Sequence, residues 1–183
     1  MNILTATALN IARGFVGVQE VGGNNRGAQV EGWLRRVHQP PGQSWCAAFQ
    51  WCIADDSFRK NSFPNPIRPS ASVVKLIASL PAVCKLTGPA PGCWAAHEEL
   101  DADGNGTGRG HIGIIDELDP ANEGTYTIEG NTNSEGSRTG GGVWRHTPRI
   151  RPLSYWNRGF WDWSAAVPSC LELVSTADPD VPQ

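Results

Sequence analysis

The chain has 183 residues, of which 39% are hydrophobic and 18% are charged, and its formal net charge is −3. This length suits one domain with a core of its own. The composition excludes a chain that is disordered throughout and a long coiled coil. Lys and Arg form no cluster, and no apolar run approaches the roughly 20 residues of a membrane span, so we expect no nucleic-acid binding and no membrane span.

The N-terminal residues 1–15 lack a basic region followed by an apolar stretch, so they do not resemble a secretory signal. We therefore expect the chain to be made in the cytoplasm without a signal peptide and to reach any outside target through another system. The five cysteines are odd in number and irregular in spacing, which argues against a disulfide framework. At least one thiol is then expected to be free.

Apolar residues recur at helical spacing in the first half of the chain. They predict helices over residues 3–16, 27–38, 44–54 and 70–80. Ser44 is the expected N-cap of the third helix, which would place Cys46 in its first turn. Residues 55–69 and 81–92 are expected to be loops or irregular.

The second half of the chain carries strand patterns instead. They begin at Trp94, cover 111–118, 126–129 and 143–146, and continue weakly to Trp163, with Gly-, Asn- and Asp-rich loops over 101–110 and 130–142. Helices followed by strands predict an α+β fold in which N-terminal helices pack on an antiparallel sheet. We expect one domain over 1–165, a C-terminal tail over 166–183, and a monomer.

Three segments carry side chains suited to catalysis. Cys46 lies at an expected helix start, where the helix dipole and free N–H groups stabilise a thiolate, the nucleophile that amide hydrolysis needs. His111 is expected to open a strand between two nearby glycines. Glu129 and Asn131 lie two residues apart near the end of the next strand, on one face if the strand alternates regularly. Either side chain would then orient the imidazole of His111.

The segments SWCAAFQWC, GHIGII and TIEGN together resemble the CHAP family of peptidoglycan hydrolases, within the wider group of NlpC/P60-like, papain-like cysteine hydrolases. The lead-in VQEVGGNN is also similar to that of CHAP-type chains. The resemblance covers about residues 5–160. It implies a papain-like core with Cys46 as nucleophile, His111 as acid and base, Glu129 as the residue that orients His111, and Asn131 in support.

The resemblance implies cleavage of an amide bond in the peptide stem or cross-bridge of bacterial peptidoglycan through a thioester on Cys46. The enzyme would be an N-acetylmuramoyl-L-alanine amidase or an endopeptidase that needs no cofactor. A phage endolysin and a toxin delivered by a secretion machine both fit, and a delivered toxin would require an immunity protein. The alternatives are a CHAP-like module that binds without turnover, and a hydrolase or transamidase acting on a protein.

Substrate contacts are expected from residues near the cysteine and from tryptophans. Family members often have a glutamine immediately before the cysteine, but this chain has Trp45 there, and Gln43 lies three residues before Cys46. The backbone N–H of Cys46 is therefore the expected oxyanion donor. We expect Trp45, Trp94 and Trp144 to line the cleft, and His38 and His146 to lie on the surface.

The loop DADGNGT resembles the start of a calcium loop. Asp101, Asp103 and Asn105 would supply side-chain oxygens and Thr107 a carbonyl, as at positions 1, 3, 5 and 7 of an EF-hand. Position 12 is Ile112 instead of the bidentate glutamate. A calcium ion that stabilises the approach to His111 is one hypothesis, and an ordinary hairpin loop is the other.

Overall fold

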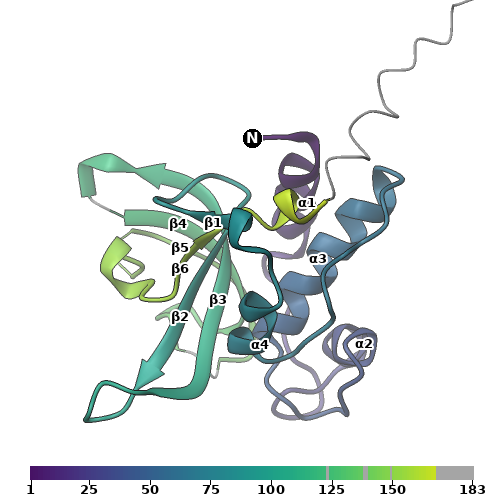
Figure 1. The fold of residues 1–183 in the computed structure, drawn as a ribbon. Helices are drawn as coiled ribbons and strands as arrows, with labels where there is room; N and C mark the ends of the chain where they lie inside the picture. Colours follow the sequence, from purple (N-terminus) through teal and green to yellow (C-terminus); the bar gives the residue numbers. More distant parts are fainter. Residues whose placement is uncertain (123, 138–139, 149, 168–183) are drawn as a thin grey trace, which may run out of the picture.

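Helices and sheet lie side by side in the computed structural model, which describes residues 1–122, 124–137, 140–148 and 150–167 (Figure 1). The helices are α1 (Ile3–Phe15), α2 (Ala28–Arg36), α3 (Cys46–Lys60) and α4 (Val73–Ala78). The strands are β1 (Lys85–Leu86), β2 (Trp94–Leu100), β3 (Gly106–Asp119), β4 (Gly124–Thr132), β5 (Gly142–His146) and β6 (Gly159–Trp161). Short 3₁₀ turns are η1 (Ala82–Cys84), η2 (Pro120–Asn122), η3 (Leu153–Tyr155) and η4 (Trp163–Ala166).

The strands form one antiparallel sheet in the order β1-β6-β2-β3-β4-β5. Its central strands β2, β3 and β4 are neighbours in the chain, and β6 returns to pair with β2 on the other side. The expected α+β class, with N-terminal helices against an antiparallel sheet, is confirmed at this level.

α1 begins with a reciprocal cap. The side-chain oxygen of Asn2 accepts a hydrogen bond from the Thr5 N–H at 3.0 Å, and the Asn2 N–H donates to Thr5 Oγ1 at 3.1 Å. Two N–H groups that would otherwise lack helical partners are thereby satisfied. The buried face of α1 packs against α3, where the Ser57 hydroxyl donates to the Leu4 carbonyl at 2.6 Å.

α3 differs from its prediction at both ends. Trp45, not Ser44, holds the N-cap position, and no side chain caps the helix. The helix also continues to Lys60, through residues expected to form a loop. Asp55 bonds to Arg36 at 2.7 Å and to Arg59 at 2.9 Å, and Phe58 is fully buried. These contacts stabilise an additional turn and a half before the first proline of that segment.

The two strands that carry the candidate site are longer than predicted. β3 begins at Gly106, so His111 lies inside the strand, opposite His97 of β2, and only residues 101–105 turn between the two strands. β4 extends to Thr132 but changes register between Glu129 and Thr132. Asn131 has a φ of 58° at this irregularity, so the regular alternation expected for this segment does not hold.

The last described element of the chain is η4. η4 ends at Ala166, whereas the tail was expected to begin at that residue, and 168–183 lie outside the described residues. None of the helices in the described part of the chain is long and apolar enough to cross a membrane.

Candidate active site

Cys46 is the first residue of α3, where unpaired backbone N–H groups favour negative charge on its sulfur. It lines a cleft of about 340 Å³. The other lining residues are Ser44, Ala71, Ser72, Val73, Gly108, Arg109, Gly110 and Asn131. The thiol lies 3.9 Å from the Gly110 carbonyl oxygen, so the start of α3 lies directly beside β3. The cleft therefore gives a substrate access to the sulfur.

His111 follows Gly110 and is fully buried. Its Nε2 lies 2.8 Å from Glu129 Oε2, whereas Nδ1 has no hydrogen-bond partner among the described residues. Burial opposes the charged imidazole, but the neighbouring Cys46 and the Glu129 carboxylate outweigh it and raise the pKa of His111 to about 9. Because the carboxylate only accepts, Nε2 carries a proton, and Nδ1 is left to exchange one with the thiol.

Glu129 is fully buried in β4, where an isolated charge would be costly. Arg151 donates to both of its oxygens, from Nε to Oε1 at 2.8 Å and from Nη2 to Oε2 at 2.7 Å. Thr127 donates to Oε1 at 2.5 Å. Burial by itself raises the pKa of Glu129. The hydrogen bonds and positive charges of His111 and Arg151 outweigh this effect and hold the pKa well below its usual range. The carboxyl is therefore ionised and held rigidly against His111.

The glycines that flank His111 make room for these groups. A Cβ at Gly113 would lie 2.7 Å from Glu129 Cγ. Only glycine at this position therefore leaves room for the Glu129 side chain. A Cβ at Gly110 would lie 2.6 Å from the His97 carbonyl oxygen. Gly110 also lines the cleft, beside Cys46.

Two residues near Glu129 were missed or misplaced by the sequence prediction. Arg151, in the loop after β5, belongs to no periodic segment that would have pointed to it. His146 was expected on the surface but is buried, with Nε2 3.7 Å from Glu129 Oε2 and 3.2 Å from Thr132 Oγ1. Burial lowers the pKa of His146, so it is neutral beside the ion pair.

Asn131 and Gln43 both lie near Cys46, in different places. Asn131 lines the cleft itself, is 2% exposed, and has a side-chain oxygen without a partner among the described residues. This oxygen is buried, and no hydrogen bond joins the Asn131 side chain to His111 among the described residues. Gln43 lines an adjoining hollow of about 450 Å³ that shares Ser44 with the cleft.

The tryptophans do not line this cleft. Trp45 is fully buried, stacks on Trp33 at 5.2 Å between ring centroids, and donates from Nε1 to Glu20 at 2.8 Å. Trp94 is fully buried against Trp163 at 5.8 Å. Both serve the core, which corrects the expectation that they bind substrate. Trp144 is half-buried on β5, opposite Glu129 in the strand ladder, and is not among the residues that line the cleft.

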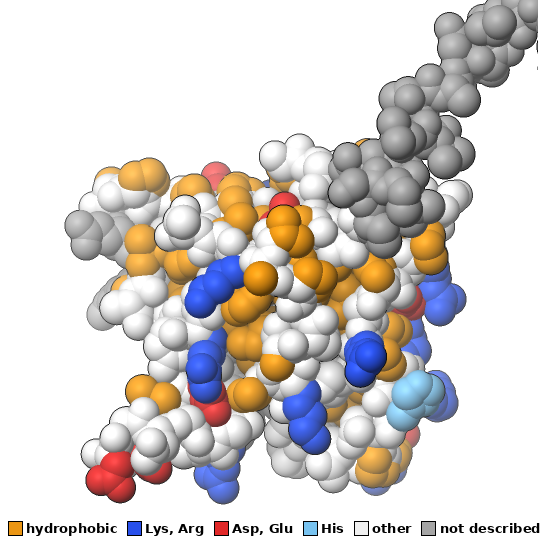
Figure 2. All heavy atoms as spheres, viewed as in Figure 1, with side chains coloured by type: hydrophobic (Ala, Val, Ile, Leu, Met, Phe, Trp, Pro, Cys, Tyr) orange, Lys and Arg blue, Asp and Glu red, His pale blue; other side chains and the backbone are white. Residues whose placement is uncertain are grey.

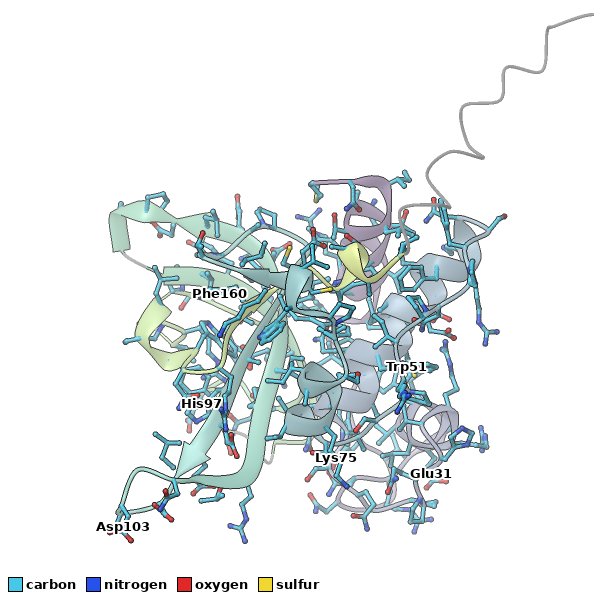
Figure 3. All side chains as sticks on the ribbon, in the orientation of Figure 1. Glu31, Trp51, Lys75, His97, Asp103 and Phe160 are labelled. Atoms are coloured by element: carbon cyan, nitrogen blue, oxygen red, sulfur yellow. The ribbon has the colours of Figure 1, made fainter. Side chains whose placement is uncertain are left out.

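The expected calcium loop is the exposed turn between β2 and β3, and Figure 3 shows Asp103 at its tip. Asp101 Oδ1 accepts from the N–H groups of Asp103 at 3.0 Å and Asn105 at 2.8 Å, and the Thr107 hydroxyl donates to a backbone carbonyl at 3.0 Å. Within the described part of the chain, no three His, Cys, Asp or Glu side chains are placed to hold a metal ion. The Asp101 carboxylate therefore bonds within its own loop, as it would in an ordinary hairpin turn.

The remaining described thiols differ from Cys46. Burial raises the pKa of Cys52 and of Cys93 to about 12, and the pKa of Cys84 to about 11. These three are protonated at neutral pH and none lines the cleft. Cys170 lies outside the described residues.

Comparison of the sequence with protein-family models and with curated proteins, and of the structure with solved structures, gives no match.

Proposed function

We propose that this protein is a papain-like cysteine hydrolase of the CHAP type that cleaves an amide bond in the peptide part of bacterial peptidoglycan. One observation carries the proposal: a helix-terminal cysteine in an open cleft lies beside a histidine that is held by a buried Glu129–Arg151 pair. A histidine that needed only to pack would not require a buried ion pair, because such pairs are costly to desolvate.

In the proposed reaction, the Cys46 sulfur attacks the carbonyl carbon while the imidazolium of His111 stabilises the thiolate. The backbone N–H of Cys46 receives the developing oxyanion. The amide C–N bond breaks as the proton on His111 Nδ1 passes to the leaving amine, which leaves a thioester on Cys46. Water then adds to the thioester with His111 as base, which releases a carboxylic acid and the free thiol.

The neighbouring groups have separate tasks. Glu129 and Arg151 fix the imidazole so that Nε2 keeps its proton and Nδ1 stays toward the sulfur. Asn131 lines the cleft, where its side chain contacts the bound substrate. This assigns Asn131 to substrate binding and leaves the orientation of His111 to Glu129.

Digestion of purified peptidoglycan tests the proposal. Wild-type protein and the Cys46→Ala variant are incubated with the wall material, and the soluble products are identified by mass spectrometry. We expect products from wild type only, each cut adding one water, with masses that name the bond. Products from a folded Cys46→Ala protein would contradict a role for the thiol. No products from either would favour a binding module or a substrate outside the wall.

A further inference from the structure

The cleft at Cys46 continues into a longer groove along α4. Its inner hollow shares Ser44, Ala71 and Ser72 with the adjoining hollow of about 450 Å³. That hollow in turn shares Pro69, Ser70 and Lys75 with a third of about 390 Å³. A connected groove of this kind suits an extended chain better than one compact small molecule.

The charged side chains that line this groove all carry positive charge. They are Arg109 beside Cys46, Lys75 in the adjoining hollow, and Arg68 in the third. Among the described residues, no Asp or Glu lines any of the three hollows. The contrast is informative because the whole chain has a net charge of −3. Figure 2 shows Lys and Arg side chains spread over the face that carries α4, while acidic side chains are most prominent at the tip of the β2–β3 hairpin.

These cations are free to bind a ligand. Arg68, Lys75 and Arg109 are exposed and form no ion pair with any of the described residues. Arginines elsewhere in the molecule are mostly tied to carboxylates, as Arg36 is to Asp55 and Asp56. Solvent-exposed cations without a partner, gathered along one groove, create a positive potential there.

The backbone around Arg109 is nonetheless fixed. The N–H of Gly108 donates to Glu98 Oε1 at 2.9 Å, and Glu98 is held by an ion pair with Arg158. The Arg109 N–H donates to Thr107 Oγ1 at 3.3 Å. Lys75 belongs to α4, which fixes the backbone from which its side chain extends (Figure 3). Both cations therefore project from defined positions in the groove.

We propose that the groove selects peptides with free carboxylates and that Arg109 and Lys75 bind those carboxylates near the bond under attack. Charge-assisted hydrogen bonds to an anion would position the amide carbonyl against the Cys46 sulfur. The inference rests on the proposed amide hydrolysis. It adds that an acidic peptide is preferred over its carboxamide counterpart, and that Arg109 and Lys75 set this preference.

The first test measures the potential at Cys46 without any substrate. Alkylation of Cys46 by anionic iodoacetate and by neutral iodoacetamide is followed by peptide mapping, and the ratio of the two rates is taken. A charge reversal about 10 Å from the sulfur changes the ratio roughly fourfold at low salt. We expect a fall of about that size in Lys75→Glu and in Arg109→Glu, and a smaller fall at high salt.

Lys60→Glu is the matched control, because Lys60 is also exposed but lies at the opposite end of α3 from Cys46. The helix separates the two by on the order of 20 Å. In Lys60→Glu, the ratio of the iodoacetate rate to the iodoacetamide rate should equal that of the wild type. An unchanged ratio in both groove variants, with circular dichroism like that of the wild type, would overturn the proposal.

The second test compares wall stem peptides that differ only in a carboxylate or a carboxamide next to the scissile bond. We expect wild type to favour the acidic peptide through a lower KM, and each groove variant to lose that preference. Equal cleavage of both peptides by wild type would overturn the proposal and leave the hydrolase function intact. If wild type cleaves neither peptide while the alkylation ratio behaves as expected, the groove would remain a site for anions and the hydrolase function would fail.

Discussion

At the scale of single residues, the proposed chemistry depends on Glu129 and on its charged partners His111 and Arg151. The carboxylate is buried, ionised and shared between His111 and Arg151. Its negative charge both orients the imidazole and keeps it protonated beside Cys46. Changes at these residues should therefore alter catalysis and stability together, but with different dependences on pH.

Glu129→Gln removes the charge that raises the pKa of His111. In wild type we expect activity to fall as the pH rises through about 9, where His111 loses its proton. In the variant this fall should begin at lower pH, and activity near neutrality should drop about 100-fold because the imidazole is less well placed. The measurement is kcat/KM against pH. Glu117→Gln, an exposed carboxylate on β3, is the control, and coincident profiles would contradict the role of Glu129.

Arg151→Met leaves Glu129 buried without its cation. We expect the free energy of unfolding at pH 7 to fall by about 3–5 kcal/mol, as is typical when one partner of a buried pair is removed. Because the folded pKa of Glu129 is lowered, its contribution to stability is present above its unfolded value of 4.5 and is lost as the pH falls toward the lower folded value.

Urea unfolding measures the cost of Arg151→Met. Arg26→Met breaks an exposed pair with Glu31 and should cost much less, because water and salt screen an exposed ion pair. The double variant Glu129→Gln/Arg151→Met should cost less than the sum of its single changes. A loss in Arg151→Met no larger than in Arg26→Met would show that the buried pair is not needed for stability.

At the scale of elements, the helix periodicity predicted all four helices, but their ends depended on contacts that are distant in sequence. α3 continues past Ala54 because Arg36 bonds to Asp55 and because Phe58 enters the core. β4 departs from regular alternation at Asn131, whose positive φ no pattern of apolar residues encodes. Local sequence thus predicts the type of the main helices and strands but not the short strand β1, which forms only by pairing with β6, and tertiary packing sets the length of each element.

Helix caps provide a stability test at this scale. Asn2→Ala breaks the reciprocal cap of α1 and should lower the free energy of unfolding by about 1 kcal/mol. Ser44→Ala should cost well under about 0.5 kcal/mol, because no side chain caps α3. Denaturant unfolding of both variants distinguishes them. An equal or larger loss in Ser44→Ala would contradict the start of α3 at Cys46.

The β2–β3 turn gives a second test. Asp101 satisfies N–H groups of its own loop, so we expect millimolar calcium or a chelator to leave the thermal midpoint unchanged. Differential scanning calorimetry measures it. A calcium-dependent rise in the midpoint that disappears in Asp101→Asn would restore the calcium hypothesis that the sequence suggested.

At the scale of the whole molecule, the candidate site combines residues from a helix, two strands and a loop. The sequence identified Cys46, His111 and Glu129 because each lies in a short segment of distinctive composition. It did not identify Arg151: a buried carboxylate requires a cation, but nothing local distinguishes Arg151 from the other arginines. The tryptophans were misassigned because a large aromatic side chain suits a core as well as a cleft.

Trapping the thioester intermediate tests the proposed function most directly. Wall peptides are digested by wild type in the presence of hydroxylamine, which attacks the thioester in place of water and releases the acyl group as a hydroxamate and Cys46 as the free thiol. We predict hydroxamate products, identified by mass, that are absent with Cys46→Ala. Carboxylic acid as the sole product at saturating hydroxylamine would contradict a thioester on Cys46, and hydroxamate formed by the folded Cys46→Ala protein would contradict Cys46 as the nucleophile.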